Sequence, residues 1–261
     1  MQQFTRKRLT RLATLAVFFT AITCMYSFAP SNFTVKNLFK KSSITYAANT
    51  ITAGVVDFAP VLSFYDSKRT VYDSLDLESM GLSRKVFNMA LKGMEKLRKT
   101  SKLHNNILSI VDFTQPSVNK RLFVVDLDNV ALLFNTFVAH GNKSGKEMAS
   151  SFSNKPSSNK SSIGFYVTGQ AYNGSNGYSL KLDGVEKGFN NNAYRRAIVM
   201  HGADYVNEDY ISSQGYIGRS QGCPAVMSDL STPIIEAIKD GSCLFIYYPL
   251  PLYLKRSTLI H

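Results

Sequence analysis

The chain has 261 residues and 44% hydrophobic content, which is enough to bury a full core, so we expect one domain plus a leader. Its formal charge is +12, but seven basic residues and no acids lie in the first 41 positions, which leaves +5 for residues 42–261. That balance is mild for a nucleic-acid-binding protein, and no basic helix or aromatic RNA-binding motif accompanies it, so we expect no nucleic-acid partner.

Residues 1–29 are typical of an export signal. A head with four basic residues precedes an apolar core over residues 12–28, and Ser-Phe-Ala at residues 27–29 fits a small-x-small cleavage site. An uncleaved membrane anchor is the alternative, although the apolar core is short and rich in threonine. We therefore expect an exported protein of the periplasm or cell envelope, with an inner-membrane anchor if the leader is retained.

A tether and a helical segment are expected next. Residues 30–75 show no sustained period and contain Lys-Lys-Ser-Ser at residues 40–43, which is typical of a linker. Residues 76–104 form the helical segment, because apolar residues recur there at steps of three and four and Ser83 is a suitable N-cap. We expect this apolar stripe to be a packing face.

Residues 105–250 are predicted to form a mainly β domain with a few helices (α+β). Strands are expected over residues 106–113, 121–128, 130–140, 166–172, 178–182, 197–200 and 242–248, where Val, Ile, Leu, Phe and Tyr dominate. Asp128-Asn129 suits a hairpin turn. A short helix is expected to begin at Pro233, capped by Thr232, and to run to Lys239. Residues 251–261 are expected to be a C-terminal tail without regular structure.

The segment 141–162 is rich in serine and asparagine and has the composition of a loop. From composition, it is an exposed flexible connection.

The most chemically suggestive stretch runs from Arg195 to Val226. A short apolar run over residues 197–200 delivers His201 to the end of a strand, and Cys223 follows Gly222 and precedes a proline in a shaped turn. A cysteine becomes a strong nucleophile when a nearby imidazole accepts its proton, so His201 and Cys223 are candidate base and nucleophile for acyl transfer through a thioester. The amides of Gly222 and Cys223 are candidate oxyanion donors.

Other uses of these residues remain open. Most cysteines are small buried hydrophobes, and an exported chain also invites a disulfide between Cys223 and Cys243, which we rank second to a free thiol. We expect no metal, because the acids that follow His201 do not form a metal-binding pattern. His104, His140 and His261 are expected to be surface or turn residues.

The sequence around His201 and Cys223 resembles that of a known family. HGADYV, followed by GRSQGCPA, resembles the active-site signature of the YkuD-type L,D-transpeptidases, and most closely the murein L,D-transpeptidase catalytic domain-like branch. The similarity extends to residues 163–199 and more loosely back to about residue 122, which is over half of the chain. It implies a β-sandwich or barrel-like catalytic domain with an N-terminal helical segment, and it would place the loop 141–162 near the donor-peptide cleft.

The resemblance assigns roles to individual residues. It implies that Cys223 is acylated, that His201 is its base, that the carbonyl of Gly202 orients the imidazole, and that Ser220 and Gly222 shape the turn. Many members have a second histidine directly before Gly-Cys and an arginine two residues after the cysteine, where this chain has Gln221 and Ala225. The substrate-binding candidates are therefore Arg219 first, then Arg195 and Arg196, with Gln221 in the histidine position.

The activity implied is that of an exported cysteine acyltransferase acting on peptidoglycan stem peptides, without a cofactor. The thiol would attack the bond between diaminopimelate and D-alanine, and an amine would resolve the thioester into a cross-link. Hydrolysis of the thioester, as in an L,D-carboxypeptidase, and a non-catalytic peptidoglycan-binding module are the alternatives. A cysteine peptidase of another fold would need an Asn or Asp partner in a different order. The sequence leaves the oligomeric state open.

Overall fold

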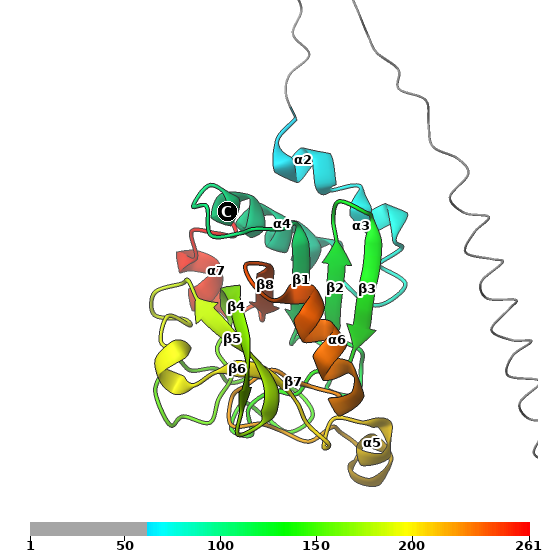
Figure 1. Ribbon diagram of the computed structural model, residues 1–261, viewed down its shortest axis with the longest axis vertical. Coiled ribbons are helices and arrows are strands. Elements are labelled where there is room, and N and C mark those ends of the chain that lie inside the picture. Colours follow the sequence, from blue (N-terminus) through cyan, green and yellow to red (C-terminus); the bar gives the residue numbers. More distant parts are fainter. Residues whose placement is uncertain (1–61) are drawn as a thin grey trace, which may run out of the picture. The chain divides into compact units, whose positions relative to one another are not determined.

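A computed structural model describes residues 62–261 and shows a single eight-stranded sheet with a few helices around it (Figure 1). The strands follow the order β3-β2-β1-β8-β4-β5-β6-β7. Their bounds are β1 Ile107–Asp112, β2 Leu122–Asp126, β3 Ala131–Thr136, β4 Gly164–Gly174, β5 Gly177–Gly184, β6 Val199–Gly202, β7 Ala225–Val226 and β8 Cys243–Tyr247. The prediction of a mainly β, α+β domain is confirmed.

The sheet is nearly closed on itself. β2 and β3 form the predicted hairpin, with Asp128 and Asn129 in its turn. The third predicted strand ends at Thr136 rather than residue 140 because the chain then leaves β2 and pairs with β7 through one bridge, Ala139 to Ala225. This bridge joins the two ends of the strand order and brings the segment after β3 beside the turn that carries Cys223.

The central strand β8 is apolar and completely buried. β8 runs parallel to β1 and antiparallel to β4, and all five of its residues are buried. Phe165 of β4 stacks on Phe245 of β8 with ring centroids 4.2 Å apart. Helix α4 (Arg84–Arg98) packs here, and Gly93 admits the Phe165 ring, since a Cβ at this position would lie 2.0 Å from it. The predicted apolar stripe and the Ser83 N-cap, which accepts from the Val86 amide, are both present.

The domain begins before the predicted end of the linker. Residues up to 61 lie outside the described part of the chain, but α2 (Phe64–Lys68) and α3 (Val71–Ser74) are short helices, and Val71 and Tyr72 are buried in the core. The linker prediction is therefore wrong for residues 64–75. Two short helices with one buried pair give too little periodicity to be recognised in sequence.

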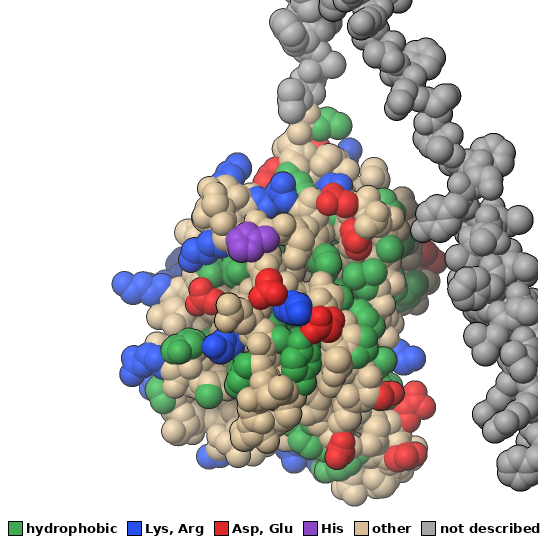
Figure 2. All heavy atoms as spheres, viewed as in Figure 1, with side chains coloured by type: hydrophobic (Ala, Val, Ile, Leu, Met, Phe, Trp, Pro, Cys, Tyr) green, Lys and Arg blue, Asp and Glu red, His purple; other side chains and the backbone are tan. Residues whose placement is uncertain are grey.

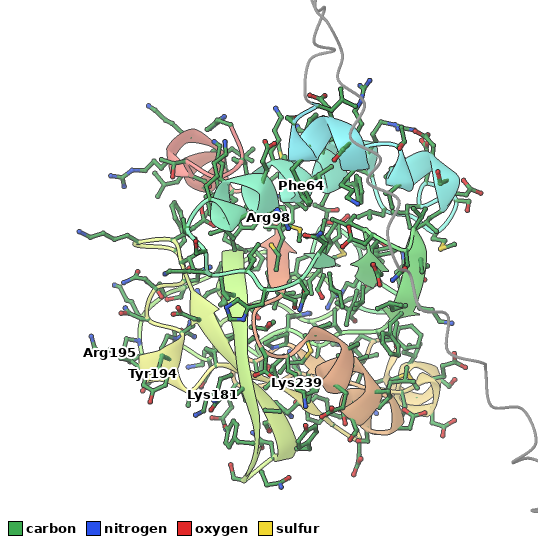
Figure 3. All side chains as sticks on the ribbon, turned by 45° about the horizontal axis from the view of Figure 1, so that its top comes forward. Phe64, Arg98, Lys181, Tyr194, Arg195 and Lys239 are labelled. Atoms are coloured by element: carbon green, nitrogen blue, oxygen red, sulfur yellow. The ribbon has the colours of Figure 1, made fainter. Side chains whose placement is uncertain are left out.

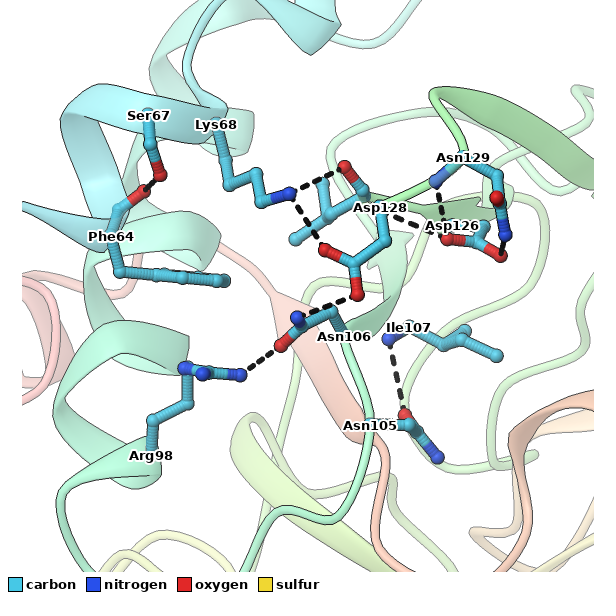
Figure 4. Close-up of polar contacts among 11 residues, drawn as sticks. Phe64, Ser67, Lys68, Arg98, Asn105, Asn106, Ile107, Asp126, Asp128 and Asn129 are labelled. Carbon is cyan, nitrogen blue, oxygen red and sulfur yellow. Dashed lines mark hydrogen bonds and ion pairs between the residues drawn. The ribbon is translucent and has the colours of Figure 1, made fainter. Parts of the chain in front are cut away.

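Polar contacts attach α2 to the β2–β3 turn (Figure 4). Lys68 Nζ lies 2.7 Å from Asp128 Oδ1 and donates to the Leu127 carbonyl at 3.1 Å. Asn106 Nδ2 donates to the other Asp128 oxygen at 2.8 Å, and Arg98 of α4 contacts Asn106 while its guanidinium lies over the Phe64 ring. These contacts lower the pKa of Asp128, chiefly through Lys68.

Two predictions for the C-terminal part are corrected. Helix α6 (Ser228–Ile238) begins about a turn earlier than predicted and contains Pro233 in its interior. Pro233 is exposed, so water can satisfy the carbonyl that lacks an N–H partner there. The predicted tail contains helix α7 (Pro251–Arg256), because Pro251 at the first position starts this helix.

The C-terminal segment is anchored inside the domain. Tyr253 is fully buried and donates to Glu186 Oε2 at 2.9 Å, and Ser257 donates to the other oxygen of the same carboxyl. Burial raises the pKa of Glu186 despite these donors. Residues 251–261 are thus part of the folded unit.

The remaining elements lie near β6. They are the 3₁₀ helix η1 (Tyr194–Arg196), which precedes β6, and helix α5 (Glu208–Gln214), which follows it. On the face drawn in Figure 2, most basic side chains lie toward the left edge and most acidic side chains lie in the centre and at the lower right. Within residues 62–261, none of the helices has the length and apolarity needed to cross a membrane; the predicted leader lies outside this range.

Candidate active site

His201 and Cys223 are brought together by neighbouring parallel strands. β6 carries His201, whose Cα is paired with that of Ala225 in β7, and Cys223 is two residues earlier in the same segment. Both side chains line one cavity of about 860 Å³. His201 and Cys223, which are 22 residues apart in the sequence, are therefore neighbours in the folded domain.

The Cys223 thiol is free and almost covered. Its residue is 9% exposed, and the sulfur accepts from the Val199 amide at 3.5 Å and contacts the Ala197 carbonyl at 3.7 Å. Burial raises the pKa of the thiol, while the Val199 N–H and the positive charge of Arg196 act in the opposite direction. Cys223 and Cys243 are both unbridged, so the alternative of a disulfide between them is wrong for this structure.

The His201 imidazole is oriented by its own backbone neighbour. Nδ1 lies 2.8 Å from the Gly202 carbonyl, so Nδ1 carries the proton and Nε2 is left as an acceptor. In the part of the chain that the structure describes, the sulfur makes no hydrogen bond with this imidazole; its polar contacts are with Val199 and Ala197. Free enzymes often show such loose contacts between nucleophile and base.

The turn before Cys223 is held by Ser220. Its hydroxyl donates to the Cys223 carbonyl at 2.6 Å and accepts from the Gly222 amide at 3.0 Å. Gly222 has φ +126°, and a Cβ there would lie 2.8 Å from the Lys160 carbonyl, so only glycine fits. The Gly222 amide donates to Ser220 in this conformation, so of the two amides predicted as oxyanion donors the Cys223 amide is the less committed one.

The three candidate arginines have different settings. Arg219 lines the cavity, and its Nη1 donates to the Gly145 carbonyl at 3.1 Å while the guanidinium lies over Tyr216. Arg196 also lines the cavity but is committed to the loop 153–162, with bonds to the Ser153 carbonyl at 2.8 Å and the Lys160 carbonyl at 2.6 Å. Arg195 is exposed and does not line the cavity; Figure 3 shows it at the outer edge of the domain beside Tyr194.

The loop 141–162 is built into the site. Ser161 is buried, accepts from the Gly141 amide at 3.0 Å and donates to the Gly222 carbonyl at 3.3 Å. Ser157 and Asn159 line the cavity. Of the two interpretations of this loop, the one that places it at the cleft agrees with the structure, and a serine-rich composition alone did not distinguish them.

The cavity lining has a distinct chemical character. In the part of the chain that the structure describes, its charged lining residues are Arg196 and Arg219, without Asp, Glu or Lys, and Gln221 is among its uncharged polar residues. Tyr205, inside the quoted HGADYV motif, also lines it, and burial raises the pKa of its hydroxyl to about 12, so the hydroxyl stays protonated at neutral pH. Tyr205, Ser161 and Asn159 were not predicted as site residues from the sequence. No group of three or more His, Cys, Asp or Glu suited to a metal occurs within residues 62–261.

His140 is the clearest error among the histidines. It was expected at the surface or in a turn, but its exposure is 0% and its Nδ1 lies 2.8 Å from an Arg121 nitrogen. The apolar residues before it, Phe137 to Ala139, continue inward toward β7 rather than ending the strand at the surface. Nothing in the sequence marks Arg121 as a buried partner.

Comparisons with solved structures give distant similarities. An L,D-transpeptidase from Mycobacterium smegmatis is 13% identical, with a TM-score of 0.34 over 55% of this chain and 59% of that one. One from Xylanimonas cellulosilytica is 13% identical, with a TM-score of 0.32 over 55% and 61%. The helical cell shape determining protein Pgp2 of Campylobacter jejuni is 12% identical, with a TM-score of 0.36 over 63% and 56%. The chain thus spans between 56% and 61% of these proteins.

The comparison with family models is more extensive. No curated protein sequence matched the chain. Residues 78–247, which include every strand of the sheet together with His201 and Cys223, match the model described as "L,D-transpeptidase catalytic domain". Because this match covers well over half of the chain, the protein belongs to the L,D-transpeptidase catalytic domain family.

Proposed function

We propose that this protein is an exported cysteine acyltransferase that acts on peptidoglycan stem peptides. One observation carries the proposal: an unbridged Cys223 and an imidazole with a free Nε2 border the same cavity, and the charged residues that line it within residues 62–261 are both arginines. Family membership supports a peptidoglycan-related activity. The transpeptidase reaction itself, the nucleophile and export are the proposal.

In the first half-reaction, His201 Nε2 accepts the Cys223 proton and the sulfur attacks the carbonyl that links diaminopimelate to D-alanine. A C–S bond forms as the C–N bond breaks, and the imidazolium returns its proton to the departing D-alanine amine. The sulfur must first turn from the Ala197 carbonyl toward the imidazole, because its present contact is with that carbonyl at 3.7 Å. The Cys223 amide is the candidate donor to the oxyanion.

In the second half-reaction, an amine of a neighbouring stem peptide attacks the thioester. His201 takes the proton of the amine, a C–N bond replaces the C–S bond, and the thiol is regenerated. Water in place of the amine would give an L,D-carboxypeptidase with the same residues. No step needs a cofactor.

Arg219 is the residue that we assign to a substrate carboxylate. Its described hydrogen bonds use a single nitrogen of the guanidinium, which leaves donors for a carboxylate in the fork geometry that arginine favours. Among the described residues, no acid lines the cavity to oppose an anionic peptide. Arg196 is not free for this role, since its bonds hold the loop 153–162, and the exposed Arg195 lies outside the cavity.

The decisive experiment is mass spectrometry of the purified protein incubated with a disaccharide tetrapeptide. We expect an adduct on Cys223 with loss of D-alanine, followed by a cross-linked dimer. A tripeptide without dimer would identify the carboxypeptidase, and no adduct at any substrate concentration would contradict an acyl-enzyme mechanism.

A non-catalytic peptidoglycan-binding module is the second candidate, favoured by the small exposure of the thiol and its contact with Ala197 rather than His201. Thiol labelling distinguishes the two. In a catalytic site, Cys223 reacts faster near neutral pH than buried Cys243 and loses that advantage in His201→Ala. Equal rates for wild type and His201→Ala would favour the binding module.

A further inference from the structure

Arg121 is the largest completely buried side chain of the described domain, and within residues 62–261 it has no acidic partner at ion-pair distance. Burial lowers its pKa to about 9, so it is still charged at neutral pH. Its nitrogens donate instead to the Gln115 carbonyl at 2.9 Å and to the Val138 carbonyl at 2.9 and 3.2 Å. The Asp112 carboxylate raises the pKa of Arg121 without forming an ion pair with it, and all the hydrogen bonds of the guanidinium go to neutral groups. A buried charge without an ion-pair partner is costly to keep.

The remaining partner of Arg121 is His140. Nη2 lies 2.8 Å from His140 Nδ1, and because a guanidinium can only donate, Nδ1 is the acceptor and the imidazole proton is on Nε2. Burial and the neighbouring Arg121 charge lower the His140 pKa to about 3. The pair is therefore a charged donor and a neutral acceptor over the physiological pH range.

The backbone around His140 supports the turn that carries Cys223. The His140 carbonyl accepts from the Ser220 amide at 3.0 Å, and the Asn142 amide donates to the Ser220 carbonyl at 2.8 Å. Ser220 in turn bonds Gly222 and Cys223 through its hydroxyl. Polar contacts thus run without a gap from Arg121 through His140 to the turn of the thiol.

We propose that Arg121 and His140 form a positioning unit that fixes the segment 138–142, and through Ser220 fixes the place of Cys223 in the cavity. Neither side chain lines the cavity, so the unit acts through the backbone. Its effect on turnover rests on the proposed function, whereas its effect on the reactivity of the thiol does not.

Two variants of similar size distinguish the effect of the Arg121–His140 hydrogen bond from the effect of side-chain volume at residue 140. In His140→Asn, Oδ1 takes the place of Nδ1 and can still accept from Arg121. His140→Leu has a similar size and offers no acceptor. His140→Gln, whose amide group extends toward the Nε2 position, is a second variant without the Nδ1 acceptor in case the leucine protein does not fold.

Two readouts are measured on each protein. The first is the rate of Cys223 alkylation by iodoacetamide against pH, with Cys243 replaced by alanine throughout so that one thiol reports. The second is the rate of adduct formation with the disaccharide tetrapeptide. We expect His140→Leu and His140→Gln to slow adduct formation on the order of 10- to 100-fold while the midpoint of alkylation moves toward that of an ordinary cysteine, because a displaced turn uncovers the sulfur. His140→Asn should stay close to the parent in both.

The matched control is Tyr253→Phe, which removes a buried hydrogen bond to Glu186 in the C-terminal segment. If the unit acts by position and not by general stability, Tyr253→Phe lowers the melting temperature without moving the alkylation midpoint. Identical alkylation profiles for the asparagine and leucine variants, or an equal shift in Tyr253→Phe, would overturn the proposal. Absence of any adduct in the parent protein, with the alkylation differences preserved, would reject the proposed function alone.

Discussion

Cys223 and Cys243 are both buried, unbridged thiols, yet their surroundings differ in access to a cavity and in the charge nearby. Cys223 lies in a turn at the edge of a cavity, with an amide donor at 3.5 Å and the charge of Arg196 nearby. Cys243 begins the central strand β8 with no exposure, and burial raises its pKa, with Glu186 adding to the increase. Burial by itself therefore does not distinguish a structural thiol from a candidate nucleophile; access and a positive partner do.

The largest expected difference comes from removing each sulfur in turn. Cys223→Ala should abolish the peptide adduct and lower activity by at least about 1,000-fold. Cys243→Ala should keep the activity and cost about 1–2 kcal/mol of stability by leaving a small void in the core. Mass spectrometry with the tetrapeptide and thermal denaturation check both, and loss of activity in Cys243→Ala with a fold intact would break the distinction.

Removing His201, the proposed base, should affect only the thiol that borders the cavity. His201→Ala is expected to slow adduct formation by roughly 100- to 10,000-fold, since general-base assistance contributes about that much. Cys243 should label at its unchanged slow rate in the same protein. His104→Gln is the control, because His104 is exposed and bonded to the Asp240 carbonyl. Equal losses in the two variants would show that His201 has no special role.

Neighbouring arginines offer a finer test. Arg196 lowers the Cys223 pKa, so Arg196→Gln should raise that pKa and slow alkylation by about threefold to tenfold at pH 8, with Cys243 unaffected. Arg195→Gln removes the same charge from an exposed position and should change little. Stopped-flow alkylation across pH distinguishes them. A faster reaction in Arg196→Gln would mean that release of the loop 153–162 outweighs the lost charge.

The free energy of unfolding at alkaline pH should also distinguish Cys223 from Cys243. Both thiols have folded pKa values raised above the usual 9.0, so each contributes stability that is complete below pH 9 and is lost as the pH rises above it. For Cys243 the loss should approach about 1.4 kcal/mol per pH unit. Cys243→Ala should therefore flatten the fall in the free energy of unfolding between pH 9 and 11. Denaturant titration against pH measures this slope, and parallel curves for variant and parent would contradict it.

Much of this fold could be predicted because its elements have strong local patterns. The stripe of α4 with its Ser83 cap, the β2–β3 hairpin and strand β8 all have periodicity or composition that tertiary contacts reinforce. The short helices α2 and α3 and the proline-initiated α7 were missed, since each depends on packing against a distant surface. Pro233 was taken as a helix start, but its exposed position lets it lie inside α6.

Only those site residues that lie within one sequence motif could be predicted. The Cys223 turn and His201 are encoded by a contiguous motif, which is why a pattern could find them. Arg121 lies directly before β2 and His140 lies four residues after β3, and only closure of the sheet brings the segment of His140 to Ser220. The different roles of the candidate arginines could not be predicted either, because they depend on contacts made by the fold. Arg196, for example, donates to backbone carbonyls of a loop more than thirty residues away in the sequence.

Closure of the sheet has a consequence for motion. The two ends of the strand order are joined by only two isolated backbone bridges, Ala139 with Ala225 and Gly141 with Ser220. We therefore expect this seam to be the weakest line in the sheet, because the strands around β8 are paired on both sides. Local opening at this seam would release the segment of Ser220 and Cys223 at a lower free energy than unfolding of the core. Amide exchange within the sheet should accordingly be quickest along residues 139–142 and 220–225, so that the part of the protein which carries the candidate nucleophile is also the first to open.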